Sequence, residues 1–499
     1  MKRILLLLMI LTVFLFSACN QEPPLDVPSL KSVVVGIPQD FDSLDPHRSV
    51  ATGTQEVMLN LFSGLITITL DGEIINDLAE EIEVSEDLMT YTVKLKQPVK
   101  FHNDQAMTSK DVAYTFNRLN GRTEDQPDPL TANFNAIESI ETPDDETVIF
   151  KMNRVDVAFL SKLMIAIIPE GSGPDQAKEP IGAGPFKFDG YTAGVGIDML
   201  RHDSYHGTLP ELEKVEFKIY TDANTGFLAL QVGEVDILNL TLDQTYSVDQ
   251  SKITVLTAPQ NMVQLITLNF EFEPFQNLKV RQALNHAINK EEIIEMLAPG
   301  SPQLDTNYSP IMGYYYNKDT EDYYDYNPDK AKELLKAAGY EDLTFSLKVP
   351  TEYPFHVDTA LLLQAQLENV GVNMKLLPIE WNTWLSEVYE SALYEASIIG
   401  LTGKLDPDTI LNRFETTFLR NFYNYSNSYY DDLIEQARKT ADPEERREIY
   451  REAQMILTEE AVAIFIMDPT LYRAVNNRLS GLHTYPIGFI DMSTVKIKD

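Results

Sequence analysis

The chain has 499 residues, and its 76 acidic against 40 basic side chains give a formal net charge of −36, which argues against nucleic acid as a partner. Its single cysteine, Cys19, excludes a disulfide scaffold, a thiolate zinc site and a cysteine nucleophile in the rest of the chain. A hydrophobic content of 44% is typical of a globular protein, and the length exceeds what one core supports, so two or more subdomains are expected.

The N-terminus has the layout of a secretory signal. An apolar run at 4–16 follows the basic pair Lys2-Arg3, and it is too short for the roughly 20 residues of a membrane-spanning helix. It leads into Leu-Phe-Ser-Ala-Cys, which resembles the lipobox of bacterial lipoproteins, with Phe16 in place of the usual aliphatic residue. The resemblance predicts a signal peptide at 1–18 and acylation of Cys19. The lipid would anchor the protein outside the cytoplasm, on the outer face of the cell membrane or in the periplasm. The alternative is an ordinary cleavable signal that ends near a cysteine.

After a proline-containing tether at 19–31, strand-like and helical patterns alternate. Alternating or β-branched runs predict strands at 32–36, 91–95, 215–220 and 263–268. Helices are predicted to begin after three capping signals: Thr108 with Asp111 three residues later, Asn327 before Pro328, and Asp442 before Pro443. Strands interleaved with helices in this way indicate an α/β protein.

Several short motifs follow one another along this framework. The longest is Val-Lys-Phe-His-Asn-Asp at 99–104, followed by Met-Thr-Ser-Lys-Asp-Val-Ala-Tyr-Thr-Phe at 107–116. Shorter ones lie at 43–46, 182–186, 233–236, 280–290 and 328–340. In this order they resemble the extracellular solute-binding proteins of ABC importers, in the oligopeptide, dipeptide and nickel class.

The resemblance implies an α/β, two-lobed periplasmic-binding-protein type II fold, with an extra subdomain in lobe one and a hinge between the lobes. Ligand is then expected in the cleft between the lobes, which close by a hinge motion that contacts of the closed state stabilise. The expected division of the chain is lobe one at 32–48, 184–265 and 475–499, its extra subdomain at 49–183, and lobe two at 266–474.

Trp381 and Trp384, the two tryptophans of the chain, follow the strand-like stretch at 375–379. A tryptophan offers a large apolar face and one donor, which suits a pocket for varied side chains. The resemblance implies a pocket position for Trp381, and Trp384 is expected in the core. The alternative is that both belong to the core of lobe two.

The segment at 400–408 resembles the family's cleft segment of lobe two. Peptide binders that hold a free amino terminus often carry an aromatic residue there and an aspartate three residues later, whereas this chain has Leu401 and Lys404. The difference argues against recognition of an ammonium group at that position, although Asp406 or Asp408 could supply a displaced carboxylate. The alternatives are that Asp408 caps the following helix and that Lys404 is an exposed loop charge.

In lobe one, the resemblance places Val50 and the region around Phe134 at the cleft. Phe134 has the core as its alternative, since large aromatic side chains are mostly buried. His202 and His206 lie four residues apart in a polar stretch without a His-Glu-x-x-His pattern, so no zinc site is expected. No nucleophile elbow or phosphate-binding loop is present, and no cofactor is expected.

The sequence therefore predicts a lipid-anchored receptor, not an enzyme, that captures oligopeptides and delivers them to the permease subunits of an ABC importer. We expect it to act as a monomer. A nickel-chelate or other small-solute receptor of the same fold is the first alternative, because Leu401 and Lys404 break the amino-terminus pattern. The alternative from another class is a secreted glycoside hydrolase that uses paired carboxylates and surface tryptophans.

Overall fold

The computed structural model describes residues 30–498. The chain divides into two units, Met1–Lys31 and Ser32–Asp499, and all the described helices and strands lie in the second. Cys19 and the predicted signal peptide lie outside the described residues. Within 30–498, no helix combines the length and the apolar character that a bilayer crossing requires.

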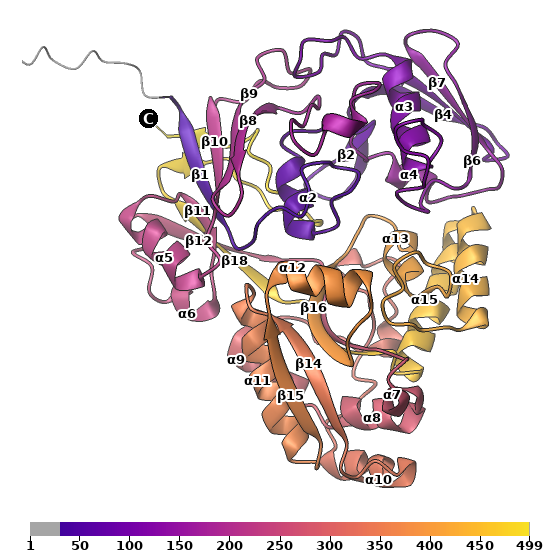
Figure 1. Ribbon diagram of the computed structural model, residues 1–499, viewed down its shortest axis with the longest axis vertical. Helices are drawn as coiled ribbons and strands as arrows, with labels where there is room; N and C mark the ends of the chain where they lie inside the picture. Colours follow the sequence, from indigo (N-terminus) through magenta and orange to yellow (C-terminus); the bar gives the residue numbers. More distant parts are fainter. Residues whose placement is uncertain (1–29, 499) are drawn as a thin grey trace, which may run out of the picture. The chain divides into compact units, whose positions relative to one another are not determined.

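Lobe one is built on a mixed sheet (Figure 1). Its strands, in spatial order, are β12 (Ile253–Pro259), β18 (Thr470–Asn476), β11 (Ile237–Asn239), β1 (Ser32–Ile37), β10 (Lys214–Ile219), β9 (Gly196–Arg201) and β8 (Phe186–Thr192). The central strand β1 runs parallel to both neighbours and buries Val33 and Val35, whose side chains point to the same face. The predicted strands at 32–36 and 215–220 are confirmed. Short helices flank this sheet: α2 (Thr52–Met58), α5 (Ala223–Val232) and α6 (Leu242–Thr245).

An extra subdomain of lobe one is built on an antiparallel sheet. Its strands are, in spatial order, β4 (Ala79–Val84), β5 (Thr90–Leu95), β7 (Thr147–Met152) and β6 (Ile137–Glu141). The predicted capping box is present, because Asp111 accepts a hydrogen bond from the Thr108 backbone at the start of α3 (Ser109–Leu119). The subdomain also contains β2 (Ile66–Ile68), β3 (Ile74–Asn76), α4 (Phe159–Lys162) and η1 (Gly173–Asp175).

The motif at 43–46 ties this subdomain to the main sheet of lobe one. Asp45 accepts two hydrogen bonds from the Arg118 guanidinium of α3, at 2.5 and 3.2 Å. Both side chains are at most 2% exposed. A buried pair of this kind is strongly destabilising to break, because either partner alone would be an uncompensated buried charge. The pair therefore holds the two parts of lobe one in a fixed relation.

Lobe two is built on a second mixed sheet. Its strands, in spatial order, are β15 (Asn373–Ile379), β14 (Thr344–Pro350), β16 (Ala396–Thr402), β13 (Met262–Leu268) and β17 (Ala463–Met467). Six of the seven residues of β13 are buried, as expected for an inner strand between two partners. Its helices are α7 (Glu273–Gln276), α8 (Leu278–His286), α9 (Lys290–Leu297), α10 (Pro328–Ala338), α11 (Pro354–Glu368), α12 (Trp381–Trp384), α13 (Asp408–Leu411), α14 (Ser428–Lys439) and α15 (Pro443–Glu459).

The remaining elements of lobe two are single turns, and the C-terminal tail adds a two-stranded ribbon. The turns are η2 (Pro310–Met312), η3 (Lys318–Thr320), the π-helical turn η4 (Leu385–Glu390) and η5 (Asn412–Phe414), and the ribbon is β19 (Leu479–Ser480) with β20 (Lys496–Ile497). The predicted caps of the long helices are confirmed. Asn327 accepts from the Lys330 backbone at 3.0 Å and Asp442 from the Glu445 backbone at 2.9 Å.

Two adjacent strands carry the chain from one sheet to the other. β12 and β18 pair in the sheet of lobe one, and their continuations β13 and β17 pair in the sheet of lobe two. The connections are only 260–261 and 468–469. At this crossing the buried Asp468 carboxylate accepts hydrogen bonds from Met262 N at 3.1 Å and Ser309 Oγ at 2.5 Å. Burial raises the Asp468 pKa to about 6. The predicted lobe limits at 265 and 474 stay predictions.

Candidate functional site

A cavity of about 450 Å³ lies between the two lobes, directly at the crossing strands. Its lining includes Gln260 and Met262 from one connection and Thr470 from the other. Its volume is within the range of pockets that hold small ligands. Because both lobes contribute to its walls, opening of the hinge would dismantle it.

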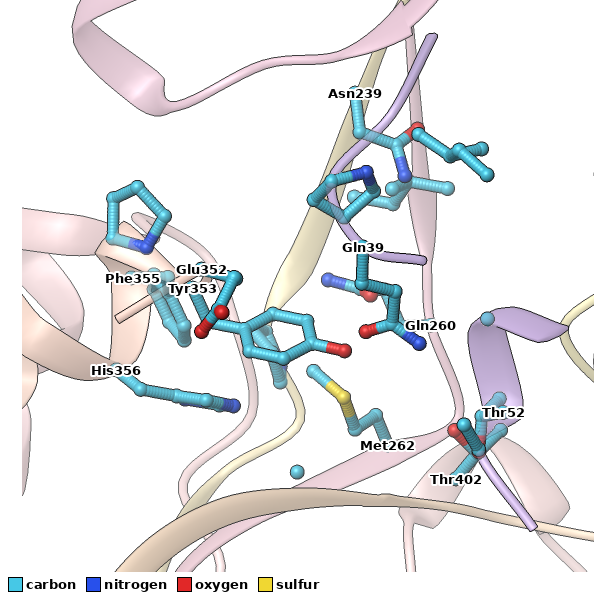
Figure 2. A pocket seen from close by; sticks show the side chains of 18 of the residues that line it. Gln39, Thr52, Asn239, Gln260, Met262, Glu352, Tyr353, Phe355, His356 and Thr402 are labelled. Carbon is cyan, nitrogen blue, oxygen red and sulfur yellow. The ribbon is translucent and has the colours of Figure 1, made fainter. Parts of the chain in front are cut away.

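Lobe one supplies the wall formed by the loop after β1, by α2, and by the segment from β11 to α6. The loop after β1 is fixed by Asp42, which accepts hydrogen bonds from the backbone of Val50 at 2.6 Å and Ala51 at 3.0 Å. Polar side chains then face the cavity from this wall, among them Gln39, Thr52 and Asn239 (Figure 2).

Lobe two supplies the wall formed by the start of α11, by α12, and by the end of β16. Figure 2 shows the Tyr353 hydroxyl directed toward Gln39 and Gln260, so this ring crosses the cavity from lobe two. Burial lowers the pKa of His356 to about 4, which keeps its ring neutral at pH 7. The neutral ring accepts a hydrogen bond from the Gln264 amide at 3.0 Å and is thereby held in place.

The two tryptophans form a stacked pair at one wall. Their ring centroids are 5.1 Å apart with an angle of 4° between the planes, and both residues line the cavity. The Trp384 indole donates to Ser397 Oγ at 2.8 Å, whereas Nε1 of Trp381 has no hydrogen-bond partner among the described residues. Trp381 is 8% exposed. The contacts give Trp384 a packing role, whereas Trp381 lines the cavity with a donor that has no partner in the described part of the chain.

Other buried polar atoms of the cavity lack a protein partner too. Gln39 is 3% exposed, and within 30–498 neither atom of its amide is hydrogen-bonded. The Nη1 atoms of Arg413 and Arg420 are also buried and have no hydrogen-bond partner among these residues. Buried polar groups are nearly always hydrogen-bonded, so atoms of this kind in a cavity are candidate partners for a ligand or for ordered water. Apart from the Gln39 carbonyl these atoms are donors, which favours a ligand rich in acceptors.

The predicted cleft residues are partly brought together. Val50, Leu401 and Trp381 line the cavity, the first from lobe one and the others from lobe two. Lys404 extends from lobe two to Gln55 on α2 of lobe one, with 3.3 Å between Nζ and the amide oxygen. It is half-buried, in a loop beside the cavity, and it is not an exposed loop charge. Their contacts with a ligand stay a prediction.

Two predicted residues lie away from the cavity. Both carboxylate oxygens of Asp406 bind the Arg446 guanidinium, at 2.8 and 2.9 Å. Phe134 is 3% exposed in the core of the extra subdomain, with its ring 5.0 Å from that of Phe116. Each of the two side chains has protein partners that account for its position. For Phe134 this is the core position that the sequence analysis gave as its alternative.

A cluster of buried charges, outside the residues that line the cavity, joins the lobes. The ammonium group of Lys162 on α4, in lobe one, is 2.9 Å from Asp156 and 3.1 Å from Asp408, the first residue of α13 in lobe two. The Arg438 guanidinium binds the same Asp408 at 2.6 Å. Burial works against the charged form of Lys162, but Asp408 and Asp156 outweigh it and raise its pKa. This ion pair exists only while the lobes are together.

Several residues of the site escaped the sequence analysis. Gln39, Tyr353 and Arg413 reach the cavity from three different segments, and neither spacing nor residue type distinguishes them from surface residues. Arg413 had one usable signal, since it follows the cleft segment at 400–408 by only five residues. Within 30–498 no group of three or more His, Cys, Asp and Glu side chains is arranged to hold a metal ion.

The family model of the bacterial extracellular solute-binding proteins, family 5, middle region, matches residues 73–421. The chain belongs to this family. The predicted family and the predicted two-lobed fold are thereby confirmed.

Individual relatives agree with the family. The dipeptide-binding protein of Escherichia coli strain K12 is 29% identical over 469 residues, which cover 85% of this chain and 86% of that protein. Heme-binding protein A of Haemophilus influenzae is 28% identical over 457 residues, which cover 83% and 82%. The structure of the periplasmic binding protein DppA from Helicobacter pylori in complex with the peptide STSA matches with a TM-score of 0.87 and 25% identity over 94% of this chain and 98% of that chain. This protein is a substrate-binding protein of a peptide-type ABC importer, and its relatives are named for different solutes.

The stacked tryptophans give a matched pair of substitutions. Trp381→Ala should weaken binding of a tripeptide pool by roughly 1 to 3 kcal/mol, the scale for burial of a large apolar side chain, and should leave the fold intact. Trp384→Ala should instead lower the free energy of unfolding by about 3 to 5 kcal/mol, because it leaves a cavity and removes the hydrogen bond to Ser397. Titration calorimetry and urea unfolding measure the two effects. Normal binding by Trp381→Ala, or equal destabilisation by both variants, would show that Trp381 has only a packing role.

The interlobe ion pair gives a second substitution. Lys162→Met should weaken binding of the same pool by about 2 to 3 kcal/mol. Without the ammonium group, the Asp156 and Asp408 carboxylates would face each other in the closed state and not in the open one, so the closed state would be destabilised. Small-angle scattering of the loaded variant should show a larger radius of gyration. Lys110→Met on the exposed side of α3 serves as the control. Unchanged affinity for Lys162→Met would exclude a role of this pair in closure.

Proposed function

We propose that this receptor captures short oligopeptides in the cavity between its lobes and hands them to the permease of its ABC importer. The observation that carries the proposal is the set of unpartnered polar atoms in that cavity, on Gln39, Trp381 and Arg413. The main chain of a peptide supplies carbonyl acceptors at regular intervals, which such donors can bind whatever the side chains are. The aromatic faces of Tyr353 and Trp381 would receive side chains of varied kind.

The size of the cavity supports a short ligand. About 450 Å³ lies in the lower half of the range for pockets that enclose small molecules. An extended chain advances about 3.3 to 3.6 Å per residue, so a long peptide would have to leave the closed cavity. The relatives named for dipeptides and the neighbour in complex with the peptide STSA are consistent with a ligand of a few residues.

A ligand screen tests this function. Because a ligand of the closed cavity binds the folded form only, a tripeptide at 100 times its dissociation constant should add about 2.7 kcal/mol to the free energy of unfolding. Thermal shift with a tripeptide pool, together with native mass spectrometry of the protein purified without added ligand, provides the measurement. Stabilisation by a nickel–histidine chelate and not by any peptide would overturn the proposal in favour of a metal-chelate receptor.

We also propose that acylation of Cys19 anchors the receptor to the membrane. The support is the sequence alone: a short apolar run, small residues, and then the single cysteine of the chain. Cys19→Ala should abolish labelling by radioactive palmitate and move the protein out of the membrane fraction, into the medium or into an uncleaved form. A Cys19→Ser variant is the matched control for side-chain size. Palmitate labelling that survives in Cys19→Ala would disprove the anchor.

A further inference from the structure

The cavity contains arginines that lack the carboxylate partners found elsewhere in the protein. Arg413, Arg420 and Arg473 line it, and within residues 30–498 none of them forms an ion pair. Three other buried or half-buried arginines, Arg118, Arg438 and Arg446, are paired with carboxylates, and the buried Arg281 is held by backbone carbonyl groups instead. In a protein with a net charge of −36, unpaired cations in the ligand cavity require an explanation.

Arg413 is the clearest case. One of its guanidinium nitrogens donates to the Thr402 carbonyl at 3.3 Å, and the other, Nη1, is buried without a partner in the described chain. Burial lowers its pKa, and the titratable groups that oppose this effect are two tyrosines, Tyr389 and Tyr423. A buried guanidinium without an anion is costly unless an anion arrives with the ligand.

Arg420 and Lys404 extend this cationic region. The Arg420 guanidinium lies over the ring of Tyr389, 5.4 Å from its centroid, and its Nη1 atom is buried and unpartnered among the described residues. Burial and the charge of Arg413 lower the pKa of Lys404 to about 8, whereas Glu56 acts to raise it. Lys404 and Arg413 are therefore close enough to repel each other, which a shared anion would relieve.

Glu56 does not neutralise the region. It lies on α2 of lobe one, where Arg473 and Lys404 are the cations that act on it. Burial nevertheless raises the pKa of Glu56, so these cations do not fully stabilise its charged form. Arg473 itself donates to the Asn239 side chain at 2.9 Å. One carboxylate is thus shared between two cations, and neither Arg413 nor Arg420 is among them.

The other acids of the cavity lie on other elements. Asp243 on α6 and Asp358 on α11 line it from opposite lobes, and Figure 1 shows these helices on the left of the picture and α13 on the right. Burial and Asp243 together raise the pKa of Asp358. Both side chains are exposed at the rim, where ion pairs contribute little. Glu352, just before α11, also lines the cavity; it is half-buried and accepts a hydrogen bond from the Trp381 backbone at 2.9 Å. None of these acids forms an ion pair with Arg413 or Arg420 among the described residues, so the two guanidinium groups stay without a carboxylate.

We propose that Arg413, Arg420 and Lys404 form a subsite for a ligand carboxylate, so that the receptor selects acids and holds a peptide by its carboxyl end at this position. This rests on the proposed function, since it names the end of the peptide that is gripped. A guanidinium presents two parallel N–H donors that match the two oxygens of a carboxylate. Lys404 adds the third cation of the subsite, from the loop in which its ammonium group reaches Gln55 of lobe one at 3.3 Å.

The experiment compares one tripeptide pool in three chemical forms: free, N-acetylated, and C-terminally amidated. Binding is followed by tryptophan fluorescence, since both tryptophans of the chain lie in the cavity wall. Amidation should weaken binding about 10- to 100-fold, the range for hydrogen bonds to a charged group, and acetylation should weaken it less than about 5-fold. A fourth probe, a pool of non-peptide dicarboxylic and tricarboxylic acids, presents the carboxylate without the peptide.

Substitutions then assign the effect to residues. Arg413→Met, Arg420→Met and Lys404→Met should each reduce the difference in affinity between the free and the amidated pool, and Arg413→Lys should retain part of it. Arg122→Met, at an exposed arginine of the extra subdomain, is the control and should leave the difference unchanged. Circular dichroism melting shows whether each variant folds. If one of them does not, the other variants and the comparison on the unaltered protein still decide the matter.

Equal binding of the free and amidated pools would overturn the carboxylate subsite and leave peptide capture standing. A large loss on acetylation alone would show that an acid of the cavity holds the ammonium group, and would likewise overturn it. If no form of peptide binds but the acid pool does, with a loss in Arg413→Met, the subsite is correct and the peptide function is wrong. If neither pool binds, both proposals fail.

Discussion

The structure depends on one constraint: two adjacent strands cross together between two sheets through connections of two residues each, 260–261 and 468–469. A pair of short connections allows rotation about the crossing and prevents the lobes from separating. Because the cavity lies directly at the crossing, a small rotation opens or closes its walls. Asp468 binds the start of β13 and Ser309 at this point, so the crossing itself is held by buried hydrogen bonds. Family 5 solute-binding proteins share this two-lobed arrangement. The side chains that line the cavity then decide which solute a member binds.

Closure brings charges together that an open form would leave in water. Lys162 meets Asp408 at 3.1 Å across the lobes, and Lys404 reaches Gln55 at 3.3 Å. The first contact balances its charges and stabilises the closed form. The second brings a cation to a region where Arg413 is already unpaired, and this opposes closure unless an anion is present. A ligand with a carboxylate would then act as the missing charge, so that capture and closure are coupled by the same groups.

Much of the fold could be predicted because its signals are either short-range patterns, such as helix caps, or motifs that follow one another in a fixed order along the chain. The cap of Asn327 and the capping box of Thr108 depend on residues three apart, and the structure has both. The motif order gave the family and thus the two lobes. Of the residues to which the resemblance pointed, Val50, Trp381 and Leu401 line the cavity and Lys404 lies in a neighbouring loop, and their contacts with a ligand stay predictions. Gln39 and Arg413 are functional candidates only because folding buries them without partners, and burial between segments hundreds of residues apart leaves no pattern in a single sequence. Asp406 looked like a cleft acid for the same reason, since its partner Arg446 is 40 residues away.

A crystal structure of the protein with a bound tripeptide tests the central claim most directly. The account predicts that the peptide lies in the interlobe cavity within hydrogen-bond distance of Trp381 Nε1 and the Gln39 amide, with its carboxylate on the guanidinium of Arg413. A peptide bound outside the cavity, or one in the cavity with its ammonium group toward Lys404 and its carboxylate toward α11, would contradict it.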